Sequence, residues 1–197
     1  PSRLLAIANE SCEFLRKTRL CKNFNELGQS INQIRVADDS SPLYLDFKPQ
    51  EIDLDNFGYM VEEHKLLEEM CKNLDPHVQL MEGVELSTIS GNLVSLSDGT
   101  KIEAELIVGA DGKNSIVRKF AEIETYDHNY LQCAIILDIK HQLNHGGAAI
   151  ENFMPNGPFA VLPKKGGYES AIVWTVESDM RDTILSLPKE VIHDVLS

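Results

Sequence analysis

The chain has 197 residues, of which 43% are hydrophobic and 25% charged, and its net charge is −13. This length predicts one domain or two small ones with a real core. The excess of acidic residues argues against nucleic acid as the main partner, because phosphate would be repelled, and no apolar run approaches the ~20 residues of a membrane span.

Two amphipathic helices are predicted in the first half of the chain. One begins at Ser2, which can cap it, and carries its apolar stripe from Leu4 to Leu15. The other begins at Tyr59 and is ended by Pro76, because proline cannot continue a helix.

Alternating apolar residues predict strands between and after these helices. The predicted strands are residues 31–36, 43–47, 78–81 and 84–89. Asp98-Gly99 lies between two further alternating runs, which predicts a hairpin turn with a positive φ and no chemistry attached.

The segment Leu106–Ala110 is apolar or small throughout, which is typical of a strand covered on both faces. Asp111-Gly112 follows at its carboxyl end, and Ser115 can cap a short helix. Ligands of open α/β sheets bind beyond the carboxyl ends of strands, and helix N-termini attract phosphate. Asp111-Gly112 is therefore either a nucleotide contact or a plain strand-to-helix turn.

The last third of the chain predicts an antiparallel sheet followed by helices. The predicted strands are residues 131–139, 149–154, 158–162 and 170–176, and the predicted helices are residues 178–185 and 188–196.

The cysteines and two histidines give no metal or redox motif. Cys12, Cys21, Cys71 and Cys133 are scattered without any CxxC spacing, which indicates reduced, buried thiols. The N-terminal residues show no secretory signal, so we expect a cytoplasmic protein. His141 and His145 have the spacing of metal ligands, but the neighbouring Gly146-Gly147 favours a solvated loop over a metal site.

Several motifs together resemble the flavin-dependent aromatic hydroxylases, in particular the ubiquinone-biosynthesis branch that hydroxylates octaprenyl-methoxyphenols. Residues 111–118 (DGKNSIVR) match the DGxxSxxR fingerprint at every fixed position, and residues 58–62 (GYMVE) are similar to GYVVE. Residues 149–153 (AIENF) and 157–163 (GPFAVLP) resemble the AFERF and GPLALLP stretches of the substrate sheet, and residues 170–175 resemble the strand that follows.

The resemblance implies a mixed α/β (α+β) fold in two parts. Residues 1–127 would form a partial Rossmann-like FAD-binding domain, with residues 31–48 joining the substrate sheet. Residues 128–197 would form a partial substrate-binding domain, an antiparallel sheet followed by helices. The family's opening GxGxxG and its later GDAAH-like segment are absent. We therefore expect this chain to correspond to the middle of such an enzyme, to bind FAD weakly and to be inactive by itself.

The implied chemistry is FAD-dependent hydroxylation of a polyprenylated phenol in ubiquinone biosynthesis. Reduced FAD would trap oxygen as a flavin hydroperoxide, with NAD(P)H or a protein reductant as electron donor. The cofactor carries the difficult step, so no catalytic side chain is expected.

The resemblance also implies site residues, each with a simpler alternative. The expected cofactor-binding residues are Arg3, Glu62, Glu63, Leu86, Asp111, Gly112 and Arg118. For Arg118 the alternative is a surface ion pair, for Arg3 a frayed terminal side chain, and for the two glutamates a favourable position at a helix N-terminus. The expected substrate-side residues are Phe153, Phe159, Val161 and Pro163, for which ordinary sheet core is the alternative.

Two other functions remain open from the sequence. The chain could be a cofactor-free remnant that acts as an interaction module, self-associating through a sheet edge beside residues 106–110 or binding other quinone-biosynthesis proteins. It could also belong to a flavoenzyme of the same fold with other chemistry, such as a halogenase or an isoprenoid reductase. At most peripheral membrane contact is expected.

Overall fold

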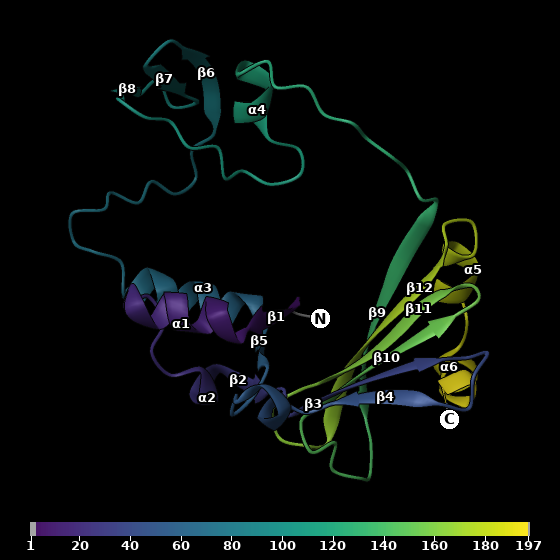
Figure 1. Ribbon diagram of the computed structural model, residues 1–197. Coiled ribbons are helices and arrows are strands. Elements are labelled where there is room, and N and C mark those ends of the chain that lie inside the picture. Colours follow the sequence, from purple (N-terminus) through teal and green to yellow (C-terminus); the bar gives the residue numbers. More distant parts are fainter. Residues whose placement is uncertain (1–2, 197) are drawn as a thin grey trace. The chain divides into compact units, whose positions relative to one another are not determined.

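The computed structural model describes residues 3–196 (Figure 1). Residue contacts divide the chain into two compact units, one formed by the residues up to Leu74 together with those from Tyr130 onward, the other by Asp75–Asn129. The predicted domains, 1–127 and 128–197, divide the chain differently and stay a prediction about functional organisation.

The N-terminal part of the first unit is a three-stranded antiparallel sheet with helices against it. The strands, in the order β1-β5-β2, are β1 (Leu4–Ala8), β5 (Gly58–Glu62) and β2 (Gly28–Ser30). The helices are α1 (Asn9–Lys17), α2 (Phe24–Leu27) and α3 (Glu63–Lys72). The buried residues that join these elements are Cys12, Cys21, Phe24, Tyr59, Val61 and Leu66.

Two segments that the sequence predicted as helix are strands. Leu4–Ala8 and Gly58–Glu62 pair antiparallel with each other, and the helices begin only afterwards, at Asn9 and Glu63. Short apolar runs are compatible with either a buried helix or a buried strand, so the pairing of residues far apart in the sequence decides. The predicted cap at Ser2 lies outside the described residues.

The rest of the first unit contains a six-stranded sheet in the order β4-β3-β10-β11-β12-β9. Its strands are β3 (Gln33–Asp38), β4 (Tyr44–Phe47), β9 (Gln132–Lys140), β10 (Ala148–Met154), β11 (Gly157–Pro163) and β12 (Glu169–Glu177). β3 and β10 are parallel, and the other neighbours are antiparallel. All six were predicted as strands. A 3-10 turn, η1 (Pro49–Ile52), follows β4.

The two faces of this sheet follow from strand alternation. Successive side chains point to opposite faces, and paired residues share a face. On β10 the inner face carries Ala149, Glu151 and Phe153, whereas the outer face carries Ile150 and Asn152.

Different elements cover these faces. On the inner face Ala149 packs with Ile31 and Met60 of the N-terminal part. On the outer face Ile135 packs with Ile184 of helix α5 (Arg181–Leu185), which is followed by α6 (Lys189–Leu196) (Figure 1). The two C-terminal helices confirm the prediction, with α5 shorter than expected.

The second unit is a small three-stranded antiparallel sheet with one short helix. It contains β6 (Leu86–Ser90), β7 (Leu93–Leu96), β8 (Lys101–Glu103) and α4 (Ile116–Phe120), which packs against β6. β7 and β8 are joined by the predicted turn, in which Gly99 has φ +89° and the Thr100 amide donates to Asp98.

Two strands predicted in this unit are absent from the described residues. Residues 78–81 and 106–110 form no strand, and Leu106 and Val108 are 78% and 76% exposed. A buried strand needs neighbours that bond its edges and cover both faces. No described residue pairs with residues 106–110, so the prediction of a buried strand is wrong here.

Candidate functional site

The loop after residue 110 is organised by hydrogen bonds around Asp111. One carboxylate oxygen accepts from the amides of Ile116 (2.6 Å) and Val117 (3.2 Å), and the other accepts from the Ser115 hydroxyl. The Ser115 oxygen accepts from the Arg118 amide at 2.9 Å. The predicted cap at Ser115 is therefore confirmed, and Asp111 adds a second cap to the same helix.

These bonds define what Asp111 can do. The Ser115 hydroxyl, followed by the amides of Val117 and Ile116, holds the pKa of Asp111 below its ordinary value. The carboxylate is thus ionised and directed at the N-terminus of α4. Its first role is to shape the loop, and a direct contact with ribose stays a prediction.

The glycines beside Asp111 leave room for a ligand next to the backbone. Gly112 has φ +81°, and an added Cβ there would meet no atom within 4 Å. At Gly109 an added Cβ would lie 2.8 Å from Val117, so glycine permits the close approach of chain and helix. An open glycine backbone beside a helix N-terminus fits a dinucleotide such as FAD.

Arg118 contacts its own loop. Its Nη2 donates to the Lys113 carbonyl at 2.7 Å. Within residues 3–196 the guanidinium group forms no ion pair with Asp111 or with another carboxylate, and a contact with phosphate stays a prediction.

A second group of predicted residues lies in the first unit, at the end of the β1–β5 pair. The Glu63 amide donates to the Arg3 carbonyl at 2.8 Å, and the Arg3 guanidinium lies 3.7 Å from the Glu63 carboxylate. The Arg3 side chain is 70% exposed. It therefore keeps donors that an anionic ligand could use.

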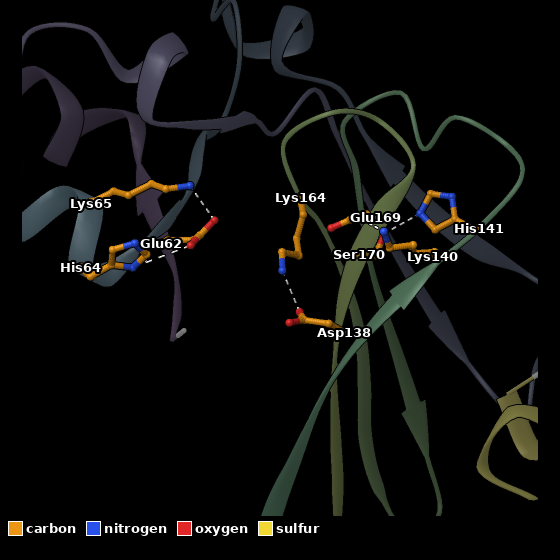
Figure 2. Close-up of polar contacts among 9 residues, drawn as sticks. All are labelled: Glu62, His64, Lys65, Asp138, Lys140, His141, Lys164, Glu169 and Ser170. Carbon is orange, nitrogen blue, oxygen red and sulfur yellow. Dashed lines mark hydrogen bonds and ion pairs between the residues drawn. The ribbon is translucent and has the colours of Figure 1, made fainter. Parts of the chain in front are cut away.

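The Glu62 carboxylate lies beside Lys65 and His64 at the start of α3 (Figure 2). It lies 2.8 Å from Lys65 Nζ and 3.7 Å from His64 Nδ1. The hydrogen bond from Lys65, with smaller contributions from the charges of His64 and Lys164, lowers the pKa of Glu62. The structure thus gives Glu62 a local role at the start of α3.

The predicted cofactor-binding residues form two separate groups. Arg3, Glu62 and Glu63 belong to the first unit. The members in the second unit are Leu86, Asp111, Gly112 and Arg118. Leu86 lies opposite Leu96, beside a register shift in β6, and its predicted backbone contact with adenine stays a prediction.

The four predicted substrate-side residues divide between the faces of the six-stranded sheet. Phe153 lies on the inner face and is 54% exposed. The register places Phe159, Val161 and Pro163 on the outer face, where Phe159 packs edge-on against Trp174. The four predicted side chains therefore cannot all line a substrate site on one face of the sheet. Sequence reasoning also passed over Glu151, although strand alternation alone places it on the face of Phe153.

The cysteines and the histidines His141 and His145 do not add to these two groups. All four cysteines are free. Cys12 and Cys21 are buried as expected, whereas Cys133 is only partly buried and Cys71 is exposed, so the expectation of buried thiols is wrong for Cys71 and is met only in part by Cys133. The imidazoles of His141 and His145 are hydrogen-bonded, respectively, to the Ser170 hydroxyl and to the Lys164 carbonyl (Figure 2 shows the former). Within residues 3–196 no group of three or more His, Cys, Asp or Glu could hold a metal ion.

The double cap on α4 gives a first prediction. Asp111→Ala removes the acceptor of the Ile116 and Val117 amides, so their protection from hydrogen exchange should fall by about fivefold. Asp98→Ala, in the other Asp-Gly pair, is the matched control and should leave these two amides unchanged. If the two amides were protected equally in the Asp111 variant and in the unsubstituted protein, the Asp111 carboxylate would not hold the loop.

Comparison with known proteins decides the family. Over 168 residues the chain is 39% identical to the ubiquinone hydroxylase UbiL of Rhodospirillum rubrum, covering 82% of this chain and 39% of that protein. It is 31% identical over 134 residues to the 3-demethoxyubiquinol 3-hydroxylase of Escherichia coli, covering 65% of this chain and 34% of that protein. The chain belongs to the ubiquinone-hydroxylase branch of the FAD-dependent monooxygenases. The predicted resemblance is thereby confirmed, and the chain spans less than half the length of these curated relatives.

Solved structures confirm the mixed α+β fold of this chain. A substituted form of PqsL from Pseudomonas aeruginosa superposes with a TM-score of 0.74 at 15% identity, covering 94% of this chain and 53% of that one. A substituted form of HpxO from Klebsiella pneumoniae, in complex with FAD, superposes with a TM-score of 0.69 at 14% identity, covering 90% of this chain and 49% of that one. No protein-family model matches the chain. Across the described residues, no helix is both long and apolar enough to cross a bilayer.

Proposed function

We propose that the protein containing this chain hydroxylates a polyprenylated phenol in ubiquinone biosynthesis, with FAD as its cofactor. The observation that carries the proposal is the 39% identity with a ubiquinone hydroxylase over most of this chain. NAD(P)H or a protein reductant supplies the electrons, and oxygen is the second substrate. The protein works in the cytoplasm, at most peripherally on the membrane, alongside other quinone-biosynthesis proteins.

In this proposal residues 1–127 serve FAD and residues 128–197 serve the substrate. FAD, when bound, supplies the activation of oxygen. Gly112 leaves its backbone open to the dinucleotide, Asp111 keeps that loop in shape, and Arg3 offers its exposed guanidinium to phosphate. These roles for the chain's own residues are supported by local geometry in each unit.

The inner face of the sheet fits an apolar substrate. Leu45, Phe153 and Ile136, on three of its strands, are 64%, 54% and 46% exposed. Apolar side chains that remain uncovered in the described residues favour a prenylated ring or its chain over a polar ligand. They would also exclude water from the ring once it is bound.

The test is product analysis with the complete gene product. Purified protein is incubated with FAD, a reductant, 2-geranylphenol and isotopically labelled oxygen gas. We expect a hydroxylated phenol that carries one labelled oxygen atom, detected by mass spectrometry. A halogenated product or a reduced prenyl chain would instead assign the protein to a flavoenzyme of the same fold with other chemistry.

Self-association is a second candidate function, favoured by the exposure of Leu106 and Val108. Apolar side chains this exposed can pair with another copy or with a partner chain. Size-exclusion chromatography of the 197-residue chain tests it. A concentration-independent monomer would contradict it.

A further inference from the structure

One carboxylate lies in the middle of an apolar row on the inner face of the sheet. The strand register defines a row of side chains that crosses all six strands, since each residue pairs with the next. From edge to edge the row is Leu45, Val36, Glu151, Ala160, Val173 and Ile136. Glu151 is its single polar member, and it lies on an interior strand of the sheet.

On this face Asp138, Asp38 and Glu169 have partners, whereas Glu151 has none among residues 3–196. Asp138 Oδ1 lies 2.9 Å from Lys164 Nζ (Figure 2), and Asp38 accepts from the backbone amide and hydroxyl of Ser40. Among residues 3–196, none donates a hydrogen bond to the Glu151 side chain or forms an ion pair with it. The carboxylate is thus an unused acceptor.

This position is unfavourable for folding. A half-buried carboxylate without a donor loses hydration and gains nothing in return, and burial alone raises the pKa of Glu151. An apolar residue would complete the row at no such cost. Placing an acceptor here makes physical sense when a ligand supplies the missing donor.

The ligand must match the surroundings of this acceptor. Along β10 its neighbours on the face are Ala149 and Phe153, and across the strands they are Val36 and Ala160. A ligand that presents one hydroxyl donor on an otherwise apolar ring fits these surroundings, whereas a hydrated cation would meet no further polar group in the row.

We propose that Glu151 recognises the substrate's phenolic hydroxyl, by accepting a hydrogen bond from it and so orienting the aromatic ring on the inner face. This inference rests on the proposed function, because a phenol must be the substrate. A hydrogen bond to a carboxylate also increases the electron density of the ring, which favours attack by an electrophilic oxygen.

The test compares two probes that differ in one donor, 2-geranylphenol and its methyl ether. Their binding to the complete gene product loaded with FAD is measured by calorimetry, without reductant. We expect the phenol to bind about tenfold more tightly than the ether. Glu151→Leu should abolish this preference while leaving binding of the ether unchanged or tighter. Glu151→Gln, which keeps an acceptor without the charge, should retain part of it and serves if the leucine variant does not fold.

Asp138→Asn is the matched control, since Asp138 lies on the same face but is paired with Lys164. It should keep the preference for the phenol. Equal binding of both probes by the unsubstituted protein would overturn the inference and leave the proposed function standing. Binding of neither probe would overturn both.

Stability provides a readout that needs no ligand. The folded state raises the pKa of Glu151 above its ordinary 4.5, so folding is penalised wherever the group is ionised. The penalty is full above the raised pKa, fades as pH falls through it and is absent below the ordinary value. The other titratable groups of this face do not contribute to this shift, and they are Asp38, Asp138, Lys140, Lys164, Glu169 and Glu177. Glu151→Gln should therefore raise the thermal midpoint at neutral pH, with the gain vanishing near pH 4. A lowered midpoint at neutral pH would show that the carboxylate already has a stabilising partner and would overturn the inference.

Discussion

Gly58→Ala is expected to destabilise the first unit by about 3 kcal/mol or more, among the largest effects of any single substitution in this chain. Gly58 has φ +133°, and a Cβ added there would lie 2.0 Å from the Ile7 carbonyl oxygen. Gly58 pairs with Ala8, so relief of this clash requires β1 and β5 to separate. Loss of that pairing would also remove the contact between Met60 of β5 and Ala149 on the inner face of the six-stranded sheet.

A matched control separates the clash from the backbone strain. Gly166 also has a positive φ, +111°, but an added Cβ there would meet no atom within 4 Å. Gly166→Ala should cost about 1 kcal/mol, the price of the left-handed backbone alone. Trp174, the chain's one tryptophan, reports denaturant unfolding of the first unit by its fluorescence. If both variants lost the same free energy of unfolding, the clash with the Ile7 carbonyl would be relieved by small backbone movements.

Phe24→Ala is expected to destabilise the same unit by about 3–5 kcal/mol. Phe24 is 1% exposed and stacks on Tyr59, with ring centroids 5.5 Å apart. Truncation would leave a cavity between α2 and β5 that the surrounding helices cannot fill without moving. Tyr59 is also tied by its hydroxyl, which donates to Asn25 at 2.9 Å, so it cannot move freely into the space.

The control for this prediction is another phenylalanine of the N-terminal part. Phe14 on α1 is 63% exposed, so Phe14→Ala removes a similar volume with little buried surface. Its effect on the free energy of unfolding should stay within about 0.5 kcal/mol. Comparable losses at both positions would contradict the core that the structure places around Phe24.

Motifs predicted some contacts of the candidate site and missed others. The motif at residues 111–118 predicted the family, and its Ser115 forms the expected cap, because a cap joins residues only three positions apart. The same motif did not reveal that the Asp111 carboxylate is engaged by its own helix or that Arg118 donates to Lys113. Those contacts depend on how the loop closes, which residue types alone do not specify.

The sequence did not predict on which face of the sheet the substrate-side residues lie. Phe153 and Phe159 come from neighbouring strands with similar apolar patterns, and both were expected to face the substrate. Their faces depend on the register between β10 and β11, which pairs Phe159 with Asn152 and thereby sends it to the outer face. A change of register by one residue would reverse this result.

The sequence by itself determined two kinds of feature. Local structure follows from residues that are neighbours in the sequence, and the family follows from short motifs. Strand alternation predicted the six strands of the large sheet, Asp98-Gly99 predicted the turn between β7 and β8, and residues 111–118 with the segments of the substrate sheet predicted the family. Only the tertiary structure decided that Leu4–Ala8 and Gly58–Glu62 are strands, that Leu106 and Val108 are exposed, and that Glu151 has no partner within residues 3–196. The physical reason is that these properties depend on which distant segments bond, cover or face a residue, and an apolar run is compatible with several such arrangements until one of them forms.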